Sequence, residues 1–269
     1  STPSNSSAAS DVYKRQGFNI IPTYNPLGFE YGKGVFGPIV ENRTLETIRQ
    51  NLMDPQSQGP EIVYSIAMDV GNNEDKQAMI ERNLLYGAVT YAKGTIGKEP
   101  VRSQGHIHAV SQSCGMSTCE VYEIWSGEAY IYMQQTAHDN PGKCYAVHAK
   151  PGDVVIVPPG WAHATIVANL QENLTFGAWC VRDFGFDYAE VRAHQGVAWF
   201  PVVEGNQIKF IANENYKKSE LIIKEPRIYE EFQIEKGIPI YQQFVDNPDK
   251  FLFVSRPQIA MEIWENFIP

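Results

Sequence analysis

The sequence predicts an all-β protein, an antiparallel sandwich or barrel. An N-terminal arm that contains a helix precedes the barrel, and a mixed C-terminal extension follows it. From about residue 61 to residue 200, short β-branched and aromatic runs alternate with Gly, Pro or Asn. Runs of this length at this spacing are typical of antiparallel sheets and not of βαβ units. The chain has 269 residues, 43% of them hydrophobic, so it can bury a sizeable core.

The composition divides the chain into four segments. Residues 1–16 are rich in Ser and poor in large apolar residues, which predicts a disordered leader. Residues 17–60 form the arm, where "NRTLETIRQNLMD" has apolar residues at helical spacing. Residues 61–203 form the β-rich core, with predicted strands in "EIVYSIAMDV", "NLLYGAVTYA", "EVYEIWSG", "EAYIYMQQ", "CYAVHA", "DVVIVPP", "ATIVANL" and "LTFGAWCV". Residues 204–269 are more charged, and "SRPQIAMEIWENFI" predicts a helix near the end.

Charge and composition exclude several classes of partner. The net charge of −9 and the pI near 5.2 argue against nucleic acid, because a phosphate-backbone binder needs excess Lys and Arg. No run approaches the roughly 18 apolar residues of a membrane span, and no signal peptide opens the chain. We therefore expect no membrane partner and a cytoplasmic location. The four cysteines form no dense disulfide framework, so we expect reduced thiols.

The stretch "GHIHAVSQSCGMSTCEVYEIWSG" contains the strongest chemical signal. His106 and His108 would share one face of a strand, as would Glu120 and Tyr122. The histidines are either a surface pair on an edge strand or two ligands of a metal ion. In favour of the second interpretation, "PGDVVIVPPGWAHA" supplies His163 after a Pro-Pro-Gly turn as a further donor.

Both stretches resemble the two cupin motifs. The first motif is a His-x-His pair, a Glu and a Gly, filled here by His106, His108, Glu120 and Gly127. The second is Gly, Pro-x-Gly and His, filled here by Gly152, Pro158, Gly160 and His163. Within cupins, "GHIHA", "EVYEIWSG" and "VPPGWAHAT" resemble the cupin-type, archaeal-style glucose-6-phosphate isomerases, and this resemblance spans roughly residues 60–200.

The resemblance implies a cupin jelly-roll barrel with one divalent metal ion. The implied ligands are His106, His108, Glu120 and His163. Fe²⁺ is the expected metal, although Mn²⁺, Ni²⁺, Co²⁺ and Zn²⁺ also suit three histidines and a carboxylate. The implied reaction interconverts glucose 6-phosphate and fructose 6-phosphate, with Glu120 as ligand and base and Tyr122 hydrogen-bonded to the sugar or to Glu120. The implied partners are a small sugar phosphate and a second copy in a homodimer.

Two departures from the archaeal pattern affect the phosphate. Cys180 and Phe186 stand where archaeal members have a Tyr and a His that contact the sugar phosphate. The remaining candidates for substrate binding are Tyr64, Thr90, Ser103, Gly105, Arg182 and Tyr188. Arg182 is the predicted replacement, because a guanidinium can bind two phosphate oxygens at once. The alternative is that Arg182 pairs with Asp183 or Asp187 at the surface.

Other functions remain open at this point. Isomerisation could proceed by proton transfer through an enediolate or by a hydride shift. The substrate could be another sugar or sugar phosphate, acted on by an isomerase or an epimerase. A non-catalytic sugar-binding cupin is the alternative from a different class. Four converging donors together with Tyr122 favour the enzyme, because a storage barrel has no use for them.

Overall fold

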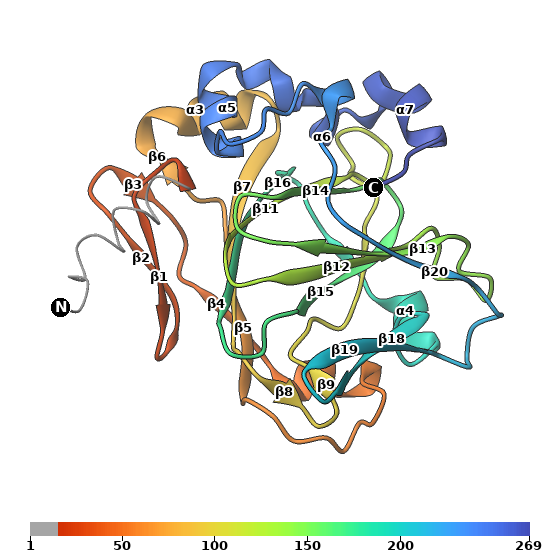
Figure 1. The fold of residues 1–269 in the computed structure, drawn as a ribbon. Coiled ribbons are helices and arrows are strands. Elements are labelled where there is room, and N and C mark those ends of the chain that lie inside the picture. The colour runs from red at the N-terminus through yellow and green to blue at the C-terminus, as the bar shows by residue number, and fades with distance from the viewer. Residues whose placement is uncertain (1–15) are drawn as a thin grey trace.

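The computed structural model describes residues 16–269, and two sheets packed face to face form its centre (Figure 1). The larger sheet has the order β14-β11-β16-β7-β5-β4, with β4 Glu41–Thr44, β5 Ile62–Met68, β7 Leu84–Tyr91, β11 Glu120–Ser126, β14 Val154–Val157 and β16 Leu174–Val181. The smaller sheet has the order β15-β12-β13-β20, with β12 Ala129–Gln134, β13 Cys144–Ala149, β15 Ala162–Val167 and β20 Leu221–Lys224. These strands include all eight predicted from the sequence.

The chain crosses between the sheets in the manner of a jelly roll. After β11 in the larger sheet it forms β12 and β13 in the smaller sheet, returns for β14, crosses again for β15 and returns to the larger sheet for β16. Apart from β13 with β20, neighbouring strands in both sheets run antiparallel. This crossing order is that of the cupin jelly-roll barrel, as expected from the two motifs.

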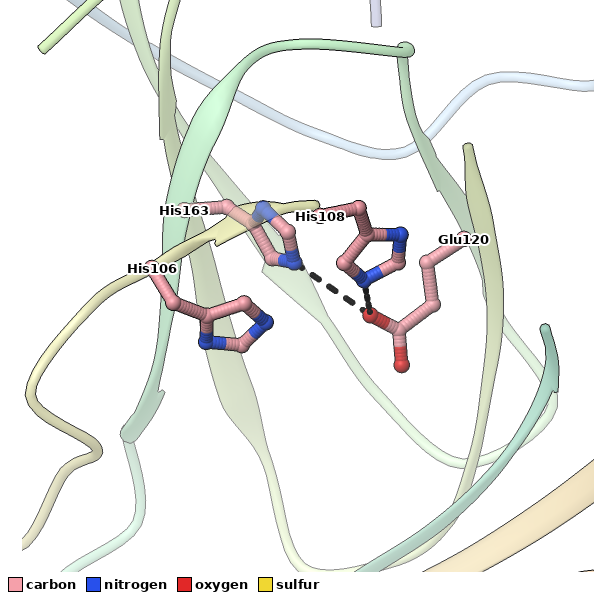
Figure 2. Close-up of side chains that lie close together, drawn as sticks. All are labelled: His106, His108, Glu120 and His163. Carbon is pink, nitrogen blue, oxygen red and sulfur yellow. Dashed lines mark hydrogen bonds and ion pairs between the residues drawn. The ribbon is translucent and has the colours of Figure 1, made fainter. Parts of the chain in front are cut away.

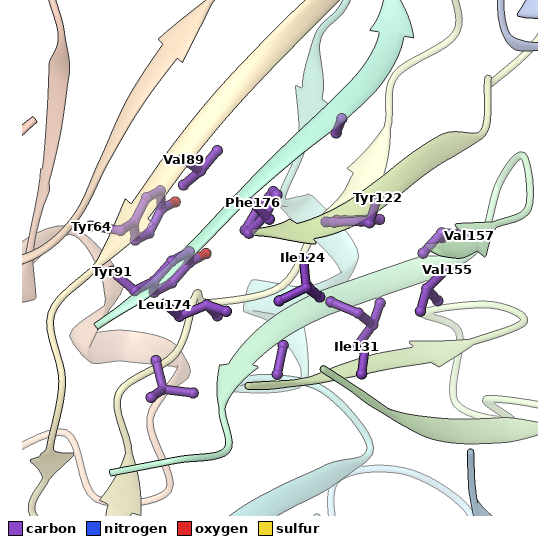
Figure 3. Packing of buried hydrophobic residues seen from close by; sticks show 14 of the residues in the cluster. Tyr64, Val89, Tyr91, Tyr122, Ile124, Ile131, Val155, Val157, Leu174 and Phe176 are labelled. Carbon is purple, nitrogen blue, oxygen red and sulfur yellow. The ribbon is translucent and has the colours of Figure 1, made fainter. Parts of the chain in front are cut away.

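Strand alternation divides the buried side chains of the larger sheet between two cores. Tyr122 and Ile124 of β11 face the smaller sheet, in the inner core of Figure 3, where Tyr64 and Tyr91 also stack with ring centroids 4.7 Å apart. Val121 and Trp125 face outward and pack under the C-terminal extension. Strand β11 is therefore buried on both faces, and each buried aromatic side chain contributes about 1.5–3 kcal/mol of hydrophobic free energy.

The C-terminal extension covers the outer face of the larger sheet. Trp179 of β16 donates its indole N–H to the carbonyl of Ile240 at 3.1 Å, and its ring lies 4.5 Å from that of Phe244. The helical elements of this region are η3 Glu230–Phe232, α5 Ile240–Asp246, η4 Pro248–Phe251, α6 Leu252–Ser255, η5 Pro257–Ala260 and α7 Met261–Glu265. The predicted helix over residues 255–268 is realised as η5 and α7, while Ser255 itself ends α6.

The remaining elements are short. The predicted arm helix is α2 Leu45–Ile48, continued by the 3₁₀ turn η1 Arg49–Asn51. The other helices are η2 Asn73–Asp75, α3 Lys76–Glu81 and α4 Ala189–Ala193. The two-stranded pairs are β1 Ile20–Tyr24 with β2 Leu27–Tyr31, β3 Val35–Phe36 with β6 Gly71–Asn72, β8 Thr95–Ile96 with β9 Glu99–Pro100, β10 Ile107–His108 with β17 Phe186–Asp187, and β18 Trp199–Glu204 with β19 Gln207–Ala212.

Three further predictions concern the leader, the cysteines and membrane-spanning segments. Residues 1–15 of the predicted leader lie outside the described part of the chain, and Gln16 is fully buried. The four cysteines are free thiols, as predicted. Among the helices of residues 16–269, none combines the length and apolar character needed to cross a bilayer.

Candidate metal centre and substrate cavity

The four predicted ligands come together from three parts of the barrel. His108 lies on β10, His163 on β15 and Glu120 at the start of β11, while His106 directly precedes β10. His106 and His163 are joined by two backbone hydrogen bonds, of 3.1 and 2.9 Å, which hold the segment before β10 against the smaller sheet. Glycines at positive φ make the motif turns, for example Gly127 at 72°, where a Cβ would lie 2.5 Å from a backbone oxygen.

The donor atoms of this cluster are close enough to bind one ion. One donor from each of His106, His108, Glu120 and His163 lies within 4.8 Å of every other. Figure 2 shows the His108 and His163 rings directed at the carboxylate, with Nε2 atoms 3.1 and 3.3 Å from Oε2 of Glu120. Donors bonded to one ion at about 2.0–2.2 Å lie up to about 4.4 Å apart, which is close to the spacing in this cluster.

The hydrogen bonds of the rings determine which nitrogen faces the centre. Nδ1 of His108 lies 2.9 Å from the carbonyl of Thr118, and Nδ1 of His163 lies 3.0 Å from that of Trp161. A carbonyl can only accept, so each Nδ1 carries the proton and each neutral ring turns the lone pair of Nε2 toward Glu120. The buried Nε2 of His106 has no hydrogen-bond partner within residues 16–269. Three such nitrogens and a carboxylate fit a divalent cation.

Electrostatics in the cluster also favour a cation. Burial lowers the pKa of His106, and the neighbouring His163 and His108 lower it further, so the ring stays neutral and can coordinate. Burial alone would raise the pKa of Glu120, but the adjacent His108 and His163 rings hold it below its usual range. The carboxylate is therefore ionised at neutral pH.

A cavity opens from the metal centre into the barrel. Its inner wall comes from alternate residues of the larger sheet, and aromatic residues from the segment after β16 complete the wall. The lining residues are Arg43, Tyr64, Ile66, Met68, Gly87, Val89, Tyr91, Ser103, His106, His108, Glu120, Tyr122, His163, Ala164, Thr165, Phe176, Ala178, Cys180, Phe184, Phe186 and Tyr188.

Tyr122 is placed beside the Glu120 carboxylate, as strand parity predicts. Burial raises the pKa of Tyr122, and the charge of Glu120 raises it further, so the hydroxyl keeps its proton. Burial and the same carboxylate also raise the pKa of Cys180. Tyr122 therefore offers a hydrogen-bond donor next to the metal ligands, whereas Cys180 is a neutral thiol.

Tyr64, Ser103 and Tyr188 line the cavity, but Thr90 and Gly105 do not. On β7 the residues that face the cavity are at odd positions, so Thr90 points to the other side, where its hydroxyl lies 3.0 Å from that of Thr175. A Cβ at position 105 would lie 2.7 Å from Val197, so Gly105 is packed against Val197. The predicted substrate contacts of Thr90 and Gly105 are therefore wrong, because neither residue lines the cavity.

The proposed phosphate contact of Arg182 is also corrected. Strand β16 ends at Val181, so the alternation that places Cys180 in the cavity does not extend to Arg182. Its guanidinium donates two hydrogen bonds to Asp69, of 2.8 and 2.9 Å, in a bidentate ion pair. The alternative partners Asp183 and Asp187 were also wrong, because Asp183 instead accepts hydrogen bonds from Ser111, Ser113 and Asn83.

Sequence reasoning missed Arg43, Tyr91 and Thr165 in the cavity wall. Tyr91 and Thr165 share strand faces with Val89 and His163, so alternation along β7 and β15 was the available signal. Arg43 could not be found in this way, because it belongs to the arm and only the pairing of β4 with β5 places it beside Tyr64.

Comparison with known proteins gives a family assignment. The family model described as "Glucose-6-phosphate isomerase (GPI)" matches residues 46–218, which is more than half of the chain. The chain belongs to this glucose-6-phosphate isomerase family. The metal cluster and the cavity of this isomerase-family chain fall within the matched residues, apart from Arg43.

Curated relatives agree with the family model. The chain is 30% identical to glucose-6-phosphate isomerase of Pyrococcus furiosus over 138 residues, covering 51% of this chain and 67% of the relative. It is 28% identical to the enzyme of Thermococcus onnurineus, covering 58% and 74%. With the enzyme of Thermococcus litoralis the identity is 26%, and the coverage is 71% and 94%.

Solved structures give weaker matches to this family member. Hazelnut (Corylus avellana) vicilin aligns with a TM-score of 0.35 at 12% identity, covering 49% of this chain and 33% of vicilin. A variant of Bacillus subtilis oxalate decarboxylase aligns with a TM-score of 0.31 at 14% identity, covering 59% of this chain and 31% of the decarboxylase. The strand order, and not these low scores, identifies the cupin fold.

Proposed function

We propose that this protein is a metal-dependent aldose–ketose isomerase that interconverts glucose 6-phosphate and fructose 6-phosphate. The observation that carries the proposal is the cluster of three imidazole nitrogens and one carboxylate that opens into a cavity lined by hydroxyls. The family membership supports the same substrate. His106, His108, Glu120 and His163 would hold one divalent ion, which we propose to be Fe²⁺, with Mn²⁺, Ni²⁺, Co²⁺ and Zn²⁺ as alternatives.

The chain's own residues account for the proton transfer. When bound, the ion would stabilise negative charge on the substrate oxygens at C1 and C2. Glu120 is ionised and lines the cavity, so its carboxylate can take the proton from one carbon and return it to the other through an enediolate. Tyr122 keeps its proton and can donate a hydrogen bond to a sugar oxygen or to Glu120. Tyr64, Ser103 and Tyr188 supply further hydroxyls in the wall.

A reconstitution assay tests this function. The protein is stripped with a chelator, reloaded with each of the five metals separately, and assayed with fructose 6-phosphate while a coupled dehydrogenase consumes glucose 6-phosphate. Metal content is measured in the same samples. We expect turnover that depends on the metal. Protein that is loaded but inactive with every metal would support the alternative, a non-catalytic sugar-binding cupin.

We also propose a homodimer. Strand β20 is the outer strand of the smaller sheet, and its Ile222 and Ile223 are 40% and 55% exposed. An edge strand with exposed apolar side chains is a common site of association between copies of a chain. Light scattering after size-exclusion chromatography measures the mass, and Ile223→Lys should shift a dimer toward the monomer.

A further inference from the structure

The proposed substrate carries a phosphate group, and a cavity that receives it needs a cation or several donors. Among the described residues that line the cavity, Arg43 is the only Lys or Arg. It lies on β4, before the segment that the family model matches. The histidines are committed to the metal centre, so Arg43 is the cation left for the substrate.

We propose that Arg43, together with the hydroxyls of Tyr64 and Tyr188, binds the phosphate of the substrate. This inference rests on the proposed function, since it names the residues that select a phosphorylated sugar. In this arrangement the N-terminal arm completes the substrate site of the barrel. Arg43 takes the role that the sequence had assigned to Arg182.

The geometry places these three side chains together. Arg43 and Tyr64 are direct partners across the β4–β5 pair, so their side chains lie on the same face of the sheet. Tyr188, which precedes α4, has its ring 5.9 Å from that of His106. Arg43, Tyr64 and Tyr188 therefore line the same cavity as the candidate metal ligands, and Tyr188 lies beside His106.

Both tyrosines can donate hydrogen bonds to a phosphate. Burial raises the pKa of Tyr64 and of Tyr188, so each hydroxyl keeps its proton at neutral pH. In both residues the charge of the nearby Arg43 guanidinium opposes this rise. Arg192 packs against the ring of Tyr188 at 4.6 Å and helps to fix its position.

The existing partner of Arg43 leaves room for an anion. Arg43 forms an ion pair with Glu41, whose side chain is 65% exposed, whereas that of Arg43 is 18% exposed. An ion pair of this kind contributes little free energy, because water screens the exposed carboxylate. A guanidinium has five N–H donors, so several remain for phosphate oxygens. By contrast, Asp69 already takes both terminal nitrogens of Arg182.

Substitution of Arg43 tests the inference on the metal-loaded protein. In Arg43→Gln we expect the KM for fructose 6-phosphate, and its dissociation constant measured by calorimetry, to rise about tenfold to hundredfold, as for loss of a charge-assisted contact. We expect kcat and metal content to change little, because the contact is equally present in the ground state and the transition state. Arg43→Lys should recover part of the affinity. The inhibition constant of inorganic phosphate should rise with the KM.

Arg182→Gln is the matched control, because that arginine is also paired with a carboxylate and is similarly buried but lies outside the cavity wall. Its KM should stay at the wild-type value. An unchanged affinity in Arg43→Gln would overturn the inference while leaving the isomerase proposal intact. Wild-type protein that binds fructose 6-phosphate without turning it over would overturn the isomerase proposal alone. Wild-type protein that does not bind fructose 6-phosphate would overturn both.

Discussion

His108 Nε2 and Glu120 Oε2 lie 3.1 Å apart, although a twelve-residue separation and a turn divide them in the sequence. The proton of the His108 ring is committed to the carbonyl of Thr118, so a lone pair faces a carboxylate across this distance. Two groups of this kind repel one another unless a cation lies between them. The carboxylate of Glu120 is thus placed to bind a cation, and the same carboxylate is the proposed base.

Glu120→Gln separates these two roles. The amide oxygen can still coordinate the ion, but the amide cannot accept the proton from the substrate carbon. We expect turnover to fall by about 10²–10⁴-fold, the usual contribution of a general base, while part of the bound metal is retained. Metal analysis and the coupled assay on the same sample measure both. Loss of metal and turnover in parallel would reduce Glu120 to a ligand only.

His106→Ala tests the ligand whose Nε2 has no hydrogen-bond partner in residues 16–269. Since this nitrogen has no structural hydrogen bond to lose, the substitution should weaken metal binding by at least about 10–100-fold, the range known for perturbed metal sites. Metal titration monitored by competition with a chelator measures the affinity. His148→Ala is the control, because His148 does not belong to the cluster. Its Nε2 lies 2.8 Å from a carboxylate oxygen of Glu128. Equal metal affinity in the two variants would exclude His106 as a ligand.

The convergence of the candidate metal ligands could be predicted from the sequence because its information is local. Strand alternation orients His106, His108 and Glu120, and a Pro-Pro-Gly turn delivers His163, so the spacing of a few residues is sufficient. The alternating apolar runs likewise predict the barrel strands. The same rule correctly places Glu123 on the face opposite to Glu120, where it contacts the C-terminal extension.

The cavity wall was harder to predict because it depends on where strands end and on what pairs with them. Arg182 was misplaced since β16 stops one residue before it, and a sequence pattern fixes strand ends poorly. Thr90 was misplaced by one residue, which on a strand reverses the face. Arg43 reaches the cavity through the long-range pairing of β4 with β5, for which the sequence has no local signal.

Removing one partner of a buried ion pair next to the cavity should destabilise the fold. Arg102 is fully buried; it donates to Glu99 at 2.8 Å and to the carbonyls of Ser103 and Asn51 at 2.9 and 2.8 Å. Arg102→Met leaves the Glu99 charge buried without its partner, so we expect the free energy of unfolding to fall by about 3–5 kcal/mol. Urea unfolding measures the change. Arg102→Met combined with Glu99→Met should be less destabilised than Arg102→Met alone, and a larger loss in the double variant would contradict this account.

The C-terminal extension depends on a buried carboxyl group. Glu123 of β11 accepts the N–H of Ile240, at the start of α5, at 2.9 Å and the indole N–H of Trp125 at 3.2 Å. Its side chain belongs to the outer face of the larger sheet, away from water. Burial raises the pKa of Glu123 to about 8, against an ordinary value of 4.5, although both hydrogen bonds oppose the rise. Folding is therefore coupled to protonation of this group.

The sign of the coupling fixes the pH dependence of stability. Between pH 4.5 and about 8 the folded state holds a proton on Glu123 that the unfolded state has released, so the free energy of unfolding falls as the pH rises through this range. Below pH 4.5 both states hold the proton, so the group does not change the free energy of unfolding with pH. Above about pH 8 both states have released it, and the stabilisation is lost completely.

Glu123→Gln cannot titrate, so its stability should decline less steeply with pH than that of the wild type, even though the amide is a poorer acceptor at this site. Urea unfolding at a series of pH values gives both slopes, and the contributions of all other groups cancel in their difference. Glu172→Gln, at an exposed turn, should keep the wild-type slope, and an unchanged slope in Glu123→Gln would show that this carboxyl stays ionised in the folded protein.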